Sequence, residues 1–156
     1  MFNRIVLILI ITGFIYAKDE QKVVLITGTA YGIGKSTAEL LIDKGHIVYG
    51  GDILVEENLY LNDIGGTALE MDVTNQEHID KAINQIISEQ GRVDVLVNNA
   101  GLGVYGAIED VSMEDIYYQY DVNLFGLARV TKAVLPYMRE EESGLIINIS
   151  SVLGET

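Results

Sequence analysis

The amino-acid sequence predicts an α/β fold: a doubly wound parallel sheet, incomplete at about five strands, with helices on both faces. Three observations predict it. Strand-like and helix-like segments alternate from Lys22 onward, a glycine-rich turn joins the first strand to the first helix, and the composition, 49% hydrophobic and 21% charged, is that of a globular chain. In this alternating order each helix carries the chain back across the sheet, so that successive strands run parallel.

Short apolar stretches mark the strands, and capping residues mark the helix ends. Gly45 and Gly91 each stop a helix. Thr74 with Glu77 has the pattern of a capping box, and we expect a later helix to start at Ser112. In chain order we expect strands at 23–26, 47–51, 67–71, 93–97 and 145–149, and helices at 35–44, 56–61, 74–91, from 112, and at 121–140.

Two of these helices carry apolar residues at helical spacing, which indicates that one face packs on the sheet. Pro136 lies inside the second of them and is expected to kink it. The residues expected to face the core are Ile79, Ala82, Ile83, Ile86 and Ile87 in the first, and Leu124, Leu127, Ala128, Thr131, Val134, Leu135 and Met138 in the second.

The turn after the first strand has the composition of a phosphate cradle. It reads Thr27-Gly28-Thr29-Ala30-Tyr31-Gly32-Ile33-Gly34. Glycines let the backbone turn sharply and approach a pyrophosphate, and the following helix N-terminus offers N–H groups to the anion. An ordinary turn between a strand and a helix is the alternative. The residues expected to bind a dinucleotide here are Gly28, Thr29, Tyr31, Gly32, Ile33 and Gly34.

Asp52 follows the second expected strand. In a Rossmann-like dinucleotide fold, an acid at this place accepts hydrogen bonds from the ribose hydroxyls of the adenosine and repels a 2′-phosphate. We therefore expect the cofactor to be NAD rather than NADP. A solvated aspartate in a turn is the alternative.

Further motifs follow the glycine turn in a fixed order. They are Asp72-Val73, Asn98-Asn99-Ala100-Gly101, Asn123 and Asn148-Ile149-Ser150-Ser151. Together with the spacing of the glycines, this series resembles the short-chain dehydrogenase/reductase family, in its compact single-domain branch. The resemblance extends from Lys22 to about Gly154, so we assign residues 22–156 to a partial dinucleotide-binding Rossmann domain.

The resemblance implies a role for each motif. Asp72 and Val73 would contact the adenine, and Asn99, Ala100 and Gly101 would close against the cofactor. Asn123 would anchor a water in a proton relay, and Ser151, with Ser150 as the alternative, would bind the substrate oxygen. NADP-preferring members usually carry Arg or Lys after the ribose-binding acid, where this chain has Ile53.

The implied reaction is hydride transfer between nicotinamide and a small-molecule carbonyl or alcohol. In the family a Tyr-x-x-x-Lys pair follows the serine by about a dozen residues, and here that place lies just past Thr156. We therefore expect a truncated chain that is inactive and poorly stable alone, and a homo-oligomer for the complete protein. A non-catalytic dinucleotide-binding module and a decayed interaction protein are the alternative functions.

The first 17 residues do not fit the cofactor fold. Arg4 precedes an apolar run from Ile5 to Ala17, which is shorter than the roughly 20 residues of a spanning helix. A signal peptide or short membrane anchor fits this pattern, with Ala17 as a cleavage position and residues 2–17 as the membrane contact. A start codon placed too far upstream and a buried extra strand are the other interpretations; without the segment we expect a cytoplasmic protein.

The composition excludes several classes of function. The formal net charge of −13 disfavours nucleic acid and anionic membrane surfaces as partners. The chain has no Cys, which excludes disulfides, thiolate catalysis and cysteine-bound zinc. His46 and His78 lie far apart in the sequence, and we expect solvent-exposed histidines rather than metal ligands.

Overall fold

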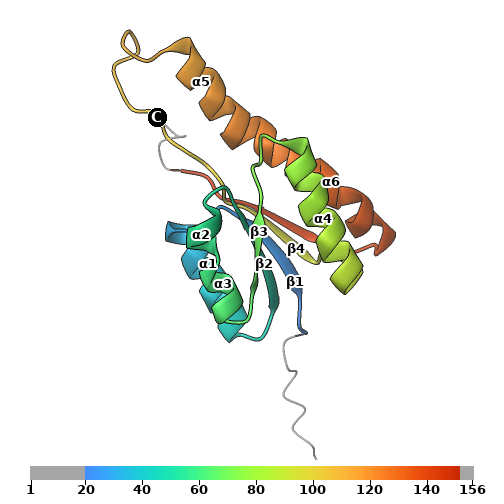
Figure 1. Cartoon of the computed structure of the whole chain (residues 1–156). Helices are drawn as coiled ribbons and strands as arrows, with labels where there is room; N and C mark the ends of the chain where they lie inside the picture. Colours follow the sequence, from blue (N-terminus) through green and yellow to red (C-terminus); the bar gives the residue numbers. More distant parts are fainter. Residues whose placement is uncertain (1–19, 152–156) are drawn as a thin grey trace, which may run out of the picture.

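The computed structural model describes residues 20–151 and shows one parallel sheet in the order β3-β2-β1-β4-β5 (Figure 1). This confirms the expected fold class. The elements are β1 (Val23–Thr27), α1 (Gly32–Asp43), β2 (Ile47–Asp52), α2 (Val55–Asn58), α3 (Tyr60–Asp63), β3 (Thr67–Glu70), α4 (Gln76–Gln90), β4 (Val95–Asn98), α5 (Met113–Tyr120), the π-helical turn η1 (Asp121–Gly126), α6 (Leu127–Glu140) and β5 (Leu145–Asn148).

The strand order reverses beside β1, which pairs in parallel with both β2 and β4. Leu25, at the middle of β1, lies opposite Tyr49 on one side and Leu96 on the other. In open α/β sheets, ligands bind outside the carboxyl ends of the strands at such a reversal. The topology therefore places the candidate site above the ends of β1, β2 and β4.

Alternate residues of β1 enter two separate cores. Val23 and Leu25 pack in a cluster with residues of α4 and α6, whereas Val24 and Ile26 pack in a second cluster with Ala38 of α1. Figure 1 shows α1, α2 and α3 on one face of the sheet and α4 and α6 on the other. All five β1 residues are buried, as expected of a strand covered on both faces.

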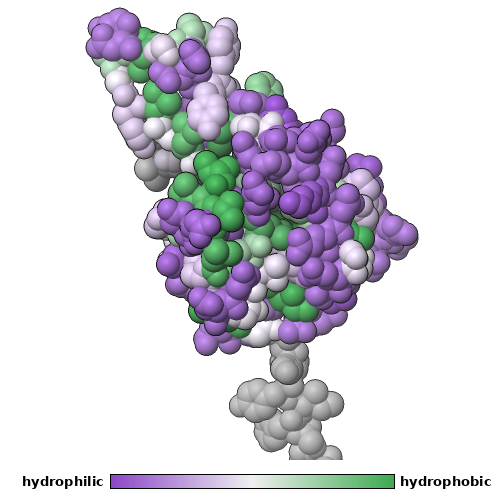
Figure 2. Space-filling model, in the orientation of Figure 1, coloured by the Kyte–Doolittle hydropathy of each residue, from purple (hydrophilic) through white to green (hydrophobic). Residues whose placement is uncertain are grey.

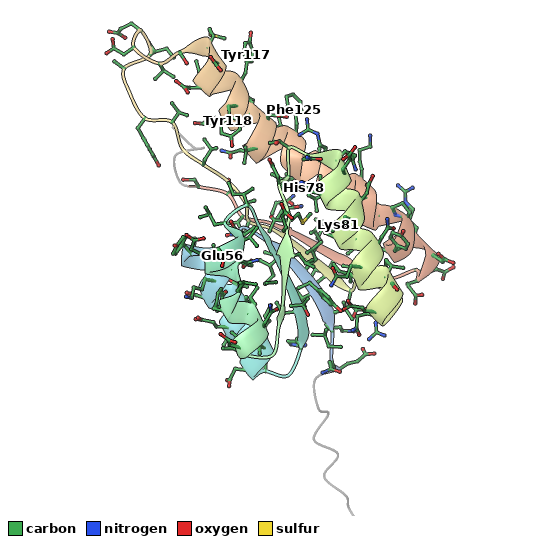
Figure 3. The ribbon with its side chains drawn as sticks, viewed as in Figure 1. Glu56, His78, Lys81, Tyr117, Tyr118 and Phe125 are labelled. Carbon is green, nitrogen blue, oxygen red and sulfur yellow. The ribbon has the colours of Figure 1, made fainter. Side chains whose placement is uncertain are left out.

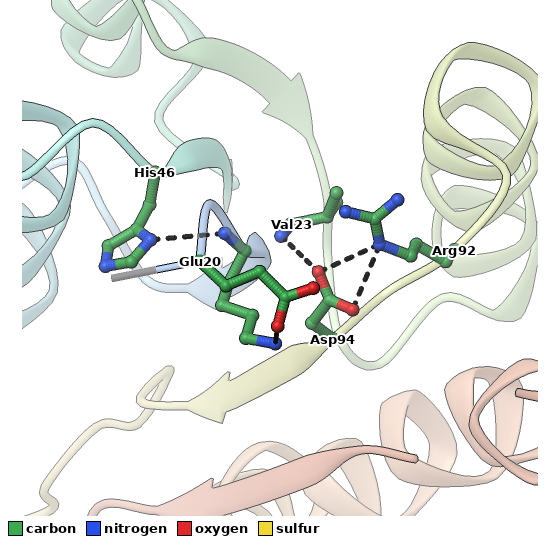
Figure 4. Close-up of polar contacts among 6 residues, drawn as sticks. Glu20, Val23, His46, Arg92 and Asp94 are labelled. Atoms are coloured by element: carbon green, nitrogen blue, oxygen red, sulfur yellow. Dashed lines mark hydrogen bonds and ion pairs between the residues drawn. The ribbon is translucent and has the colours of Figure 1, made fainter. Parts of the chain in front are cut away.

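A polar cluster joins the strands at the end of the sheet opposite to the site (Figure 4). The Asp94 carboxylate accepts a 2.6 Å hydrogen bond from the backbone N–H of Val23 and pairs with the guanidinium of Arg92 at 3.1 Å. The ring of His46 accepts a hydrogen bond from the Lys22 backbone at 3.2 Å. His46 is thus half-buried and structural, in place of the exposed side chain expected.

Two local expectations about helix ends are corrected. The α4 N-cap is Asn75, whose side-chain oxygen accepts from the N–H groups of Glu77 and His78, because Thr74 is already bound to Asp72. The helix expected at 56–61 is two short helices, α2 and α3, which meet at Leu59.

The buried stripe of the long helix differs from the one expected. Val134 and Met138 are buried as expected, but Val122, Gly126 and Val130 continue their stripe, whereas the Leu124 and Ala128 side chains are exposed. The sequence carries two adjacent apolar stripes, and periodicity alone does not select between them. The π-helical turn η1 fixes the choice, because its extra residue rotates the helix face that meets the sheet.

Within residues 20–151, β5 is an edge strand that pairs only with β4, and the Leu145 and Ile147 side chains are exposed. No helix of this described part is long and apolar enough to cross a membrane. The signal peptide or anchor expected at 1–17 lies outside the described residues.

Tyr49 predicts a loss of stability at alkaline pH. It is 1% exposed, and its hydroxyl donates to Glu89 at 2.6 Å, which ties β2 to α4. Burial and the neighbouring carboxylate raise the pKa of Tyr49 from 10.0 to about 12. Because the folded-state pKa is the higher one, the free energy of unfolding should be maintained below pH 10 and fall as the pH rises towards 12.

The measurement is urea unfolding of the chain between pH 9 and about 12, compared with Tyr49→Phe and with Tyr117→Phe as a control at an exposed tyrosine. The free energy of unfolding of Tyr49→Phe should fall less over this range than that of the parent chain. That of Tyr117→Phe should fall by as much as in the parent chain. Equal losses in all three would contradict the prediction.

Candidate cofactor-binding and active site

Two adjoining cavities lie above the carboxyl ends of the central strands. The smaller, about 220 Å³, is lined by Gly28, Asp52, Asp72 and Val73 among others. The larger, about 660 Å³, is lined by Asn99, Asn123, Ser150 and Ser151 among others. Ala100 and Gly101 line both cavities. The fold therefore brings residues from six separate places in the sequence to one edge of the sheet.

The glycine turn is shaped by contacts that only glycine permits. Gly28 has φ +75°, and a Cβ there would lie 2.9 Å from Ala100 Cα. A Cβ on Gly34 would strike the carbonyl oxygen of Gly28. Gly34 thus allows the first turn of α1 to press against the end of β1, which is the packing role of the last glycine in a dinucleotide motif.

Gly32 differs from these two glycines, because a Cβ on it would meet no atom of the described chain within 4 Å. It has φ +60° and is the first residue of α1. The N-cap residue Tyr31 makes no side-chain bond to the first turn of α1, so these backbone N–H groups have no side-chain cap. The space at Gly32 therefore opens beside uncapped backbone donors, as an anion cradle requires.

The side chains of Thr29, Tyr31 and Ile33, three other residues of the turn, line neither of the two cavities. The Thr29 side chain is fully buried, and its hydroxyl donates to Asn58 at 2.8 Å. Tyr60 donates to the Thr29 carbonyl at 3.0 Å and lies under the Lys35 ammonium, 4.3 Å from its ring centre. The side chains of Tyr31 and Ile33 are both more than half exposed and line neither cavity.

Four hydrogen bonds tie the turn to the segment after β4. The Thr27 hydroxyl accepts from the backbone N–H groups of Asn99, at 3.0 Å, and Ala100, at 2.9 Å. In return the Asn99 amide donates to the carbonyls of Thr27, at 2.9 Å, and Gly28, at 2.8 Å. Residues more than seventy positions apart in the chain thereby form one rigid wall between the two cavities.

Asp52 is held by two backbone donors. One carboxylate oxygen accepts from Ala30 N at 2.8 Å and the other from Leu54 N at 2.9 Å. The side chain is only 9% exposed and lines the smaller cavity. Asp52 is therefore not a solvated turn residue: its charge has a fixed position at the cavity wall.

Asp72 and Val73 lie at the far wall of the smaller cavity. One oxygen of Asp72 accepts from the Thr74 backbone at 2.8 Å and from its hydroxyl at 2.7 Å. Val73 is buried against Gly126, where a Cβ would approach the Val73 side chain to 2.6 Å. The glycine in η1 thus lets the long helix approach the wall of the cavity.

The Asn123 side chain lies in η1 and bonds the loop after β4 in both directions. Its oxygen accepts from Leu102 N at 2.9 Å, and its amide donates to Leu102 O at 2.8 Å. Ser151 lines the same cavity from the end of β5, and so does Ser150. π-Helical turns are often found at functional sites, and here the turn brings the asparagine to the cavity.

Three structural residues of the site were not among the site residues expected. Thr27 is the first residue of the glycine motif, so the sequence indicated that it lies near the site but not that it bonds Asn99 and Ala100. Asn98 donates to Thr131 at 3.0 Å and to Asn148 at 2.9 Å, and so links β4 to α6 and β5. Asn58 bonds Thr29 and the Gly50 carbonyl from a buried position, which no sequence pattern indicated.

The comparisons with known proteins identify the family. A protein-family model described as short chain dehydrogenase matches residues 22–156. The chain belongs to the short-chain dehydrogenase family. Its members use NAD(P), and the open space at Gly32 beside the uncapped start of α1 fits the phosphates of such a dinucleotide.

Similar proteins include a 3-ketodihydrosphingosine reductase from Bacteroides thetaiotaomicron, 48% identical over 136 residues, which are 86% of this chain and 49% of the relative. A 3-oxoacyl-[acyl-carrier-protein] reductase from Thermotoga maritima is 39% identical, over 86% of this chain and 57% of the relative. The crystal structure of a short-chain dehydrogenase from Streptomyces avermitilis has a TM-score of 0.80 at 37% identity, covering 87% of this chain and 51% of that one. The chain spans about half the length of the relatives that it matches.

The open space at Gly32 predicts a selective effect on cofactor binding. Gly32→Val should weaken NADH binding by about tenfold or more, because the branched side chain would fill the approach of the pyrophosphate. Gly45→Val is the matched control. Gly45 is also left-handed, with φ +85°, and has open space at its Cβ, but it lies at the other end of α1.

Titration by nicotinamide fluorescence, with thermal unfolding of each variant, measures the two effects. Both substitutions should cost similar stability, since a branched residue is strained in the left-handed region. Only Gly32→Val should lose NADH affinity. Equal affinities in the two variants would show that this turn is not the cradle.

Proposed function

We propose that this protein is an NAD-dependent oxidoreductase that transfers a hydride between nicotinamide and a carbonyl or alcohol substrate. The observation that carries the proposal is the fixed Asp52 carboxylate at the wall of the smaller cavity. A carboxylate there accepts hydrogen bonds from two ribose hydroxyls and repels a 2′-phosphate. The following residue is Ile53, which offers that phosphate no positive charge.

In this proposal the cofactor supplies the hydride chemistry, and the residues of this chain bind and orient. Asp52 holds the ribose, the turn from Gly28 to Gly34 holds the phosphates, and the Ser151 hydroxyl orients the substrate oxygen. The Asn123 amide is committed to both backbone groups of Leu102. The proposed contribution of the Asn123 side chain is therefore to position the loop after β4. The water of a proton relay would be bound by the backbone of Asn123.

The proposed substrate is a long-chain ketone that carries an amine. A 3-ketodihydrosphingosine reductase is the most similar of the relatives described above. The residues that line the larger cavity are uncharged, and the segment from Val93 to Ala128, which supplies many of them, has acidic residues elsewhere and no Lys, Arg or His. Its loop and α5 also expose Tyr105, Ile108 and Met113. Negative charge beside apolar surface suits a cationic amphiphile better than an anionic acyl carrier.

Residues 1–17 are proposed, on their sequence alone, to act as a signal peptide or short membrane anchor. The complete protein is proposed to be a homo-oligomer, as the family resemblance implies. A non-catalytic dinucleotide-binding module remains the alternative function, and it predicts NADH binding without turnover in a chain of any length.

Cofactor preference is the first test. The chain should bind NADH at least about tenfold more tightly than NADPH, because the buried carboxylate of Asp52 repels the 2′-phosphate. Asp52→Ala combined with Ile53→Arg should invert the preference. Fluorescence titration of both cofactors measures it, and Ile53→Ala is the control that removes the apolar side chain without changing charge. Tighter NADPH binding by the parent chain would refute the assignment.

Turnover is the second test. The 156-residue chain should bind NADH but show no detectable reduction of 3-ketodihydrosphingosine. The family's Tyr-x-x-x-Lys pair does not follow Ser151 in these residues, and general acid–base catalysis typically raises the rate by about 10²–10⁴-fold. A longer chain that contains the pair should oxidise NADH with this substrate, and more slowly with its N-acetyl derivative, which lacks the positive charge. Turnover by the 156-residue chain would contradict the need for the pair. Equal rates with the two substrates would contradict the preference for a cationic substrate.

A further inference from the structure

The outer wall of the smaller cavity contains an aromatic residue to which neither the sequence nor the family motifs assign a role. Tyr118 extends from α5 and lines this cavity together with Val122 of η1. Ile53 and Leu54 line it from the segment after β2. The cavity thus lies between a tyrosine on one element and aliphatic side chains on another.

The smaller cavity is lined by large apolar side chains and by two carboxylates. Ile53, Leu54 and Tyr118 are large side chains that expose 59%, 41% and 49% of their surface, although each faces a cavity. Figure 2 shows hydrophobic surface gathered where the projecting end of the molecule meets its body. Asp52 and Asp72 supply carboxylates to the same cavity. Apolar walls with polar groups at the edge fit a flat heteroaromatic ring with hydrogen-bonding edges.

The neighbouring tyrosine does not share this environment. Tyr117 is 68% exposed and lines neither of the two cavities. Figure 3 shows the two side chains leaving different sides of α5. Successive residues of a helix point about 100° apart, so only one of the pair can face the cavity. Tyr117 is therefore a matched control for the loss of an aromatic side chain from α5.

We propose that Tyr118 forms the aromatic wall of the adenine subsite and contributes to NAD affinity by stacking on, or packing against, the base. The proposal rests on the proposed function, because it takes the smaller cavity as the adenosine end of the dinucleotide site. Tyr118 is a binding residue with no part in hydride or proton transfer. Contacts of this kind require only the ring and not the phenolic hydroxyl.

The experiment compares the parent chain with Tyr118→Ala, Tyr118→Phe and Tyr117→Ala. Each is titrated with NADH and with reduced nicotinamide mononucleotide, which carries the same reporter ring but no adenosine. Tyr118→Ala should weaken NADH binding by about tenfold, the usual size of a lost base–aromatic contact, and leave mononucleotide binding unchanged. Tyr118→Phe and Tyr117→Ala should bind both ligands as the parent does.

The outcomes separate this inference from the proposed function. If the parent chain binds NADH and Tyr118→Ala binds it equally well, the inference is wrong and the proposed function stands. An equal loss of both ligands in Tyr118→Ala would show a general structural effect and would also overturn the inference. A parent chain that binds no NADH would overturn the proposed function itself, and the adenine assignment with it.

Discussion

The site depends on the reciprocal hydrogen bonding between the ends of β1 and β4. Thr27 offers its hydroxyl and carbonyl to the segment after β4, and Asn99 returns its amide to the turn after β1. These groups satisfy backbone polar atoms just past Ile26 and Val97, the last residues at which β1 and β4 pair. The glycine turn on one side and the loop after β4 on the other are positioned relative to this junction, and Asn123 then bonds the loop at Leu102.

Polar residues behind the turn extend the same principle. Asn58 is buried, and its three hydrogen bonds join the turn to the carbonyls of Gly50 and Leu69. A Cβ on Gly50 would approach the Thr29 hydroxyl to 2.5 Å, so this strand glycine makes room for the arrangement. Buried polar groups that are satisfied in this way favour one backbone conformation over its competitors. The Asp52 carboxylate is consequently presented at a fixed place, although it follows directly after a strand.

The order of elements was predictable because each signal was local. Alternating strands and helices, the glycine turn and the helix stop at Gly91 are read from neighbouring residues, and they define the sheet and the edge where the site lies. Long-range bonding was not predictable: nothing near Asn58 indicates that it binds Thr29, and nothing near Asp94 indicates Val23. The buried stripe of the long helix was predicted correctly at Val134 and Met138 but not through η1, where Val122 and Gly126 are buried and Leu124 is exposed, because no propensity scale reveals a π-helical turn.

The Asp94 cluster lies at the opposite end of β1 and β4 from the junction made by Thr27 and Asn99. The same two strands are therefore joined at one end by the hydrogen bond from Val23 N–H to the Asp94 carboxylate and at the other by the groups that shape the candidate site. Stability and ligand selectivity can therefore be engineered at opposite ends of these two strands. Substitutions around Lys22, Arg92 and His46 should alter thermal resistance without changing the candidate site, whereas libraries aimed at ligand selectivity should keep Thr27 and Asn99, which hold the two strands together at the carboxyl edge.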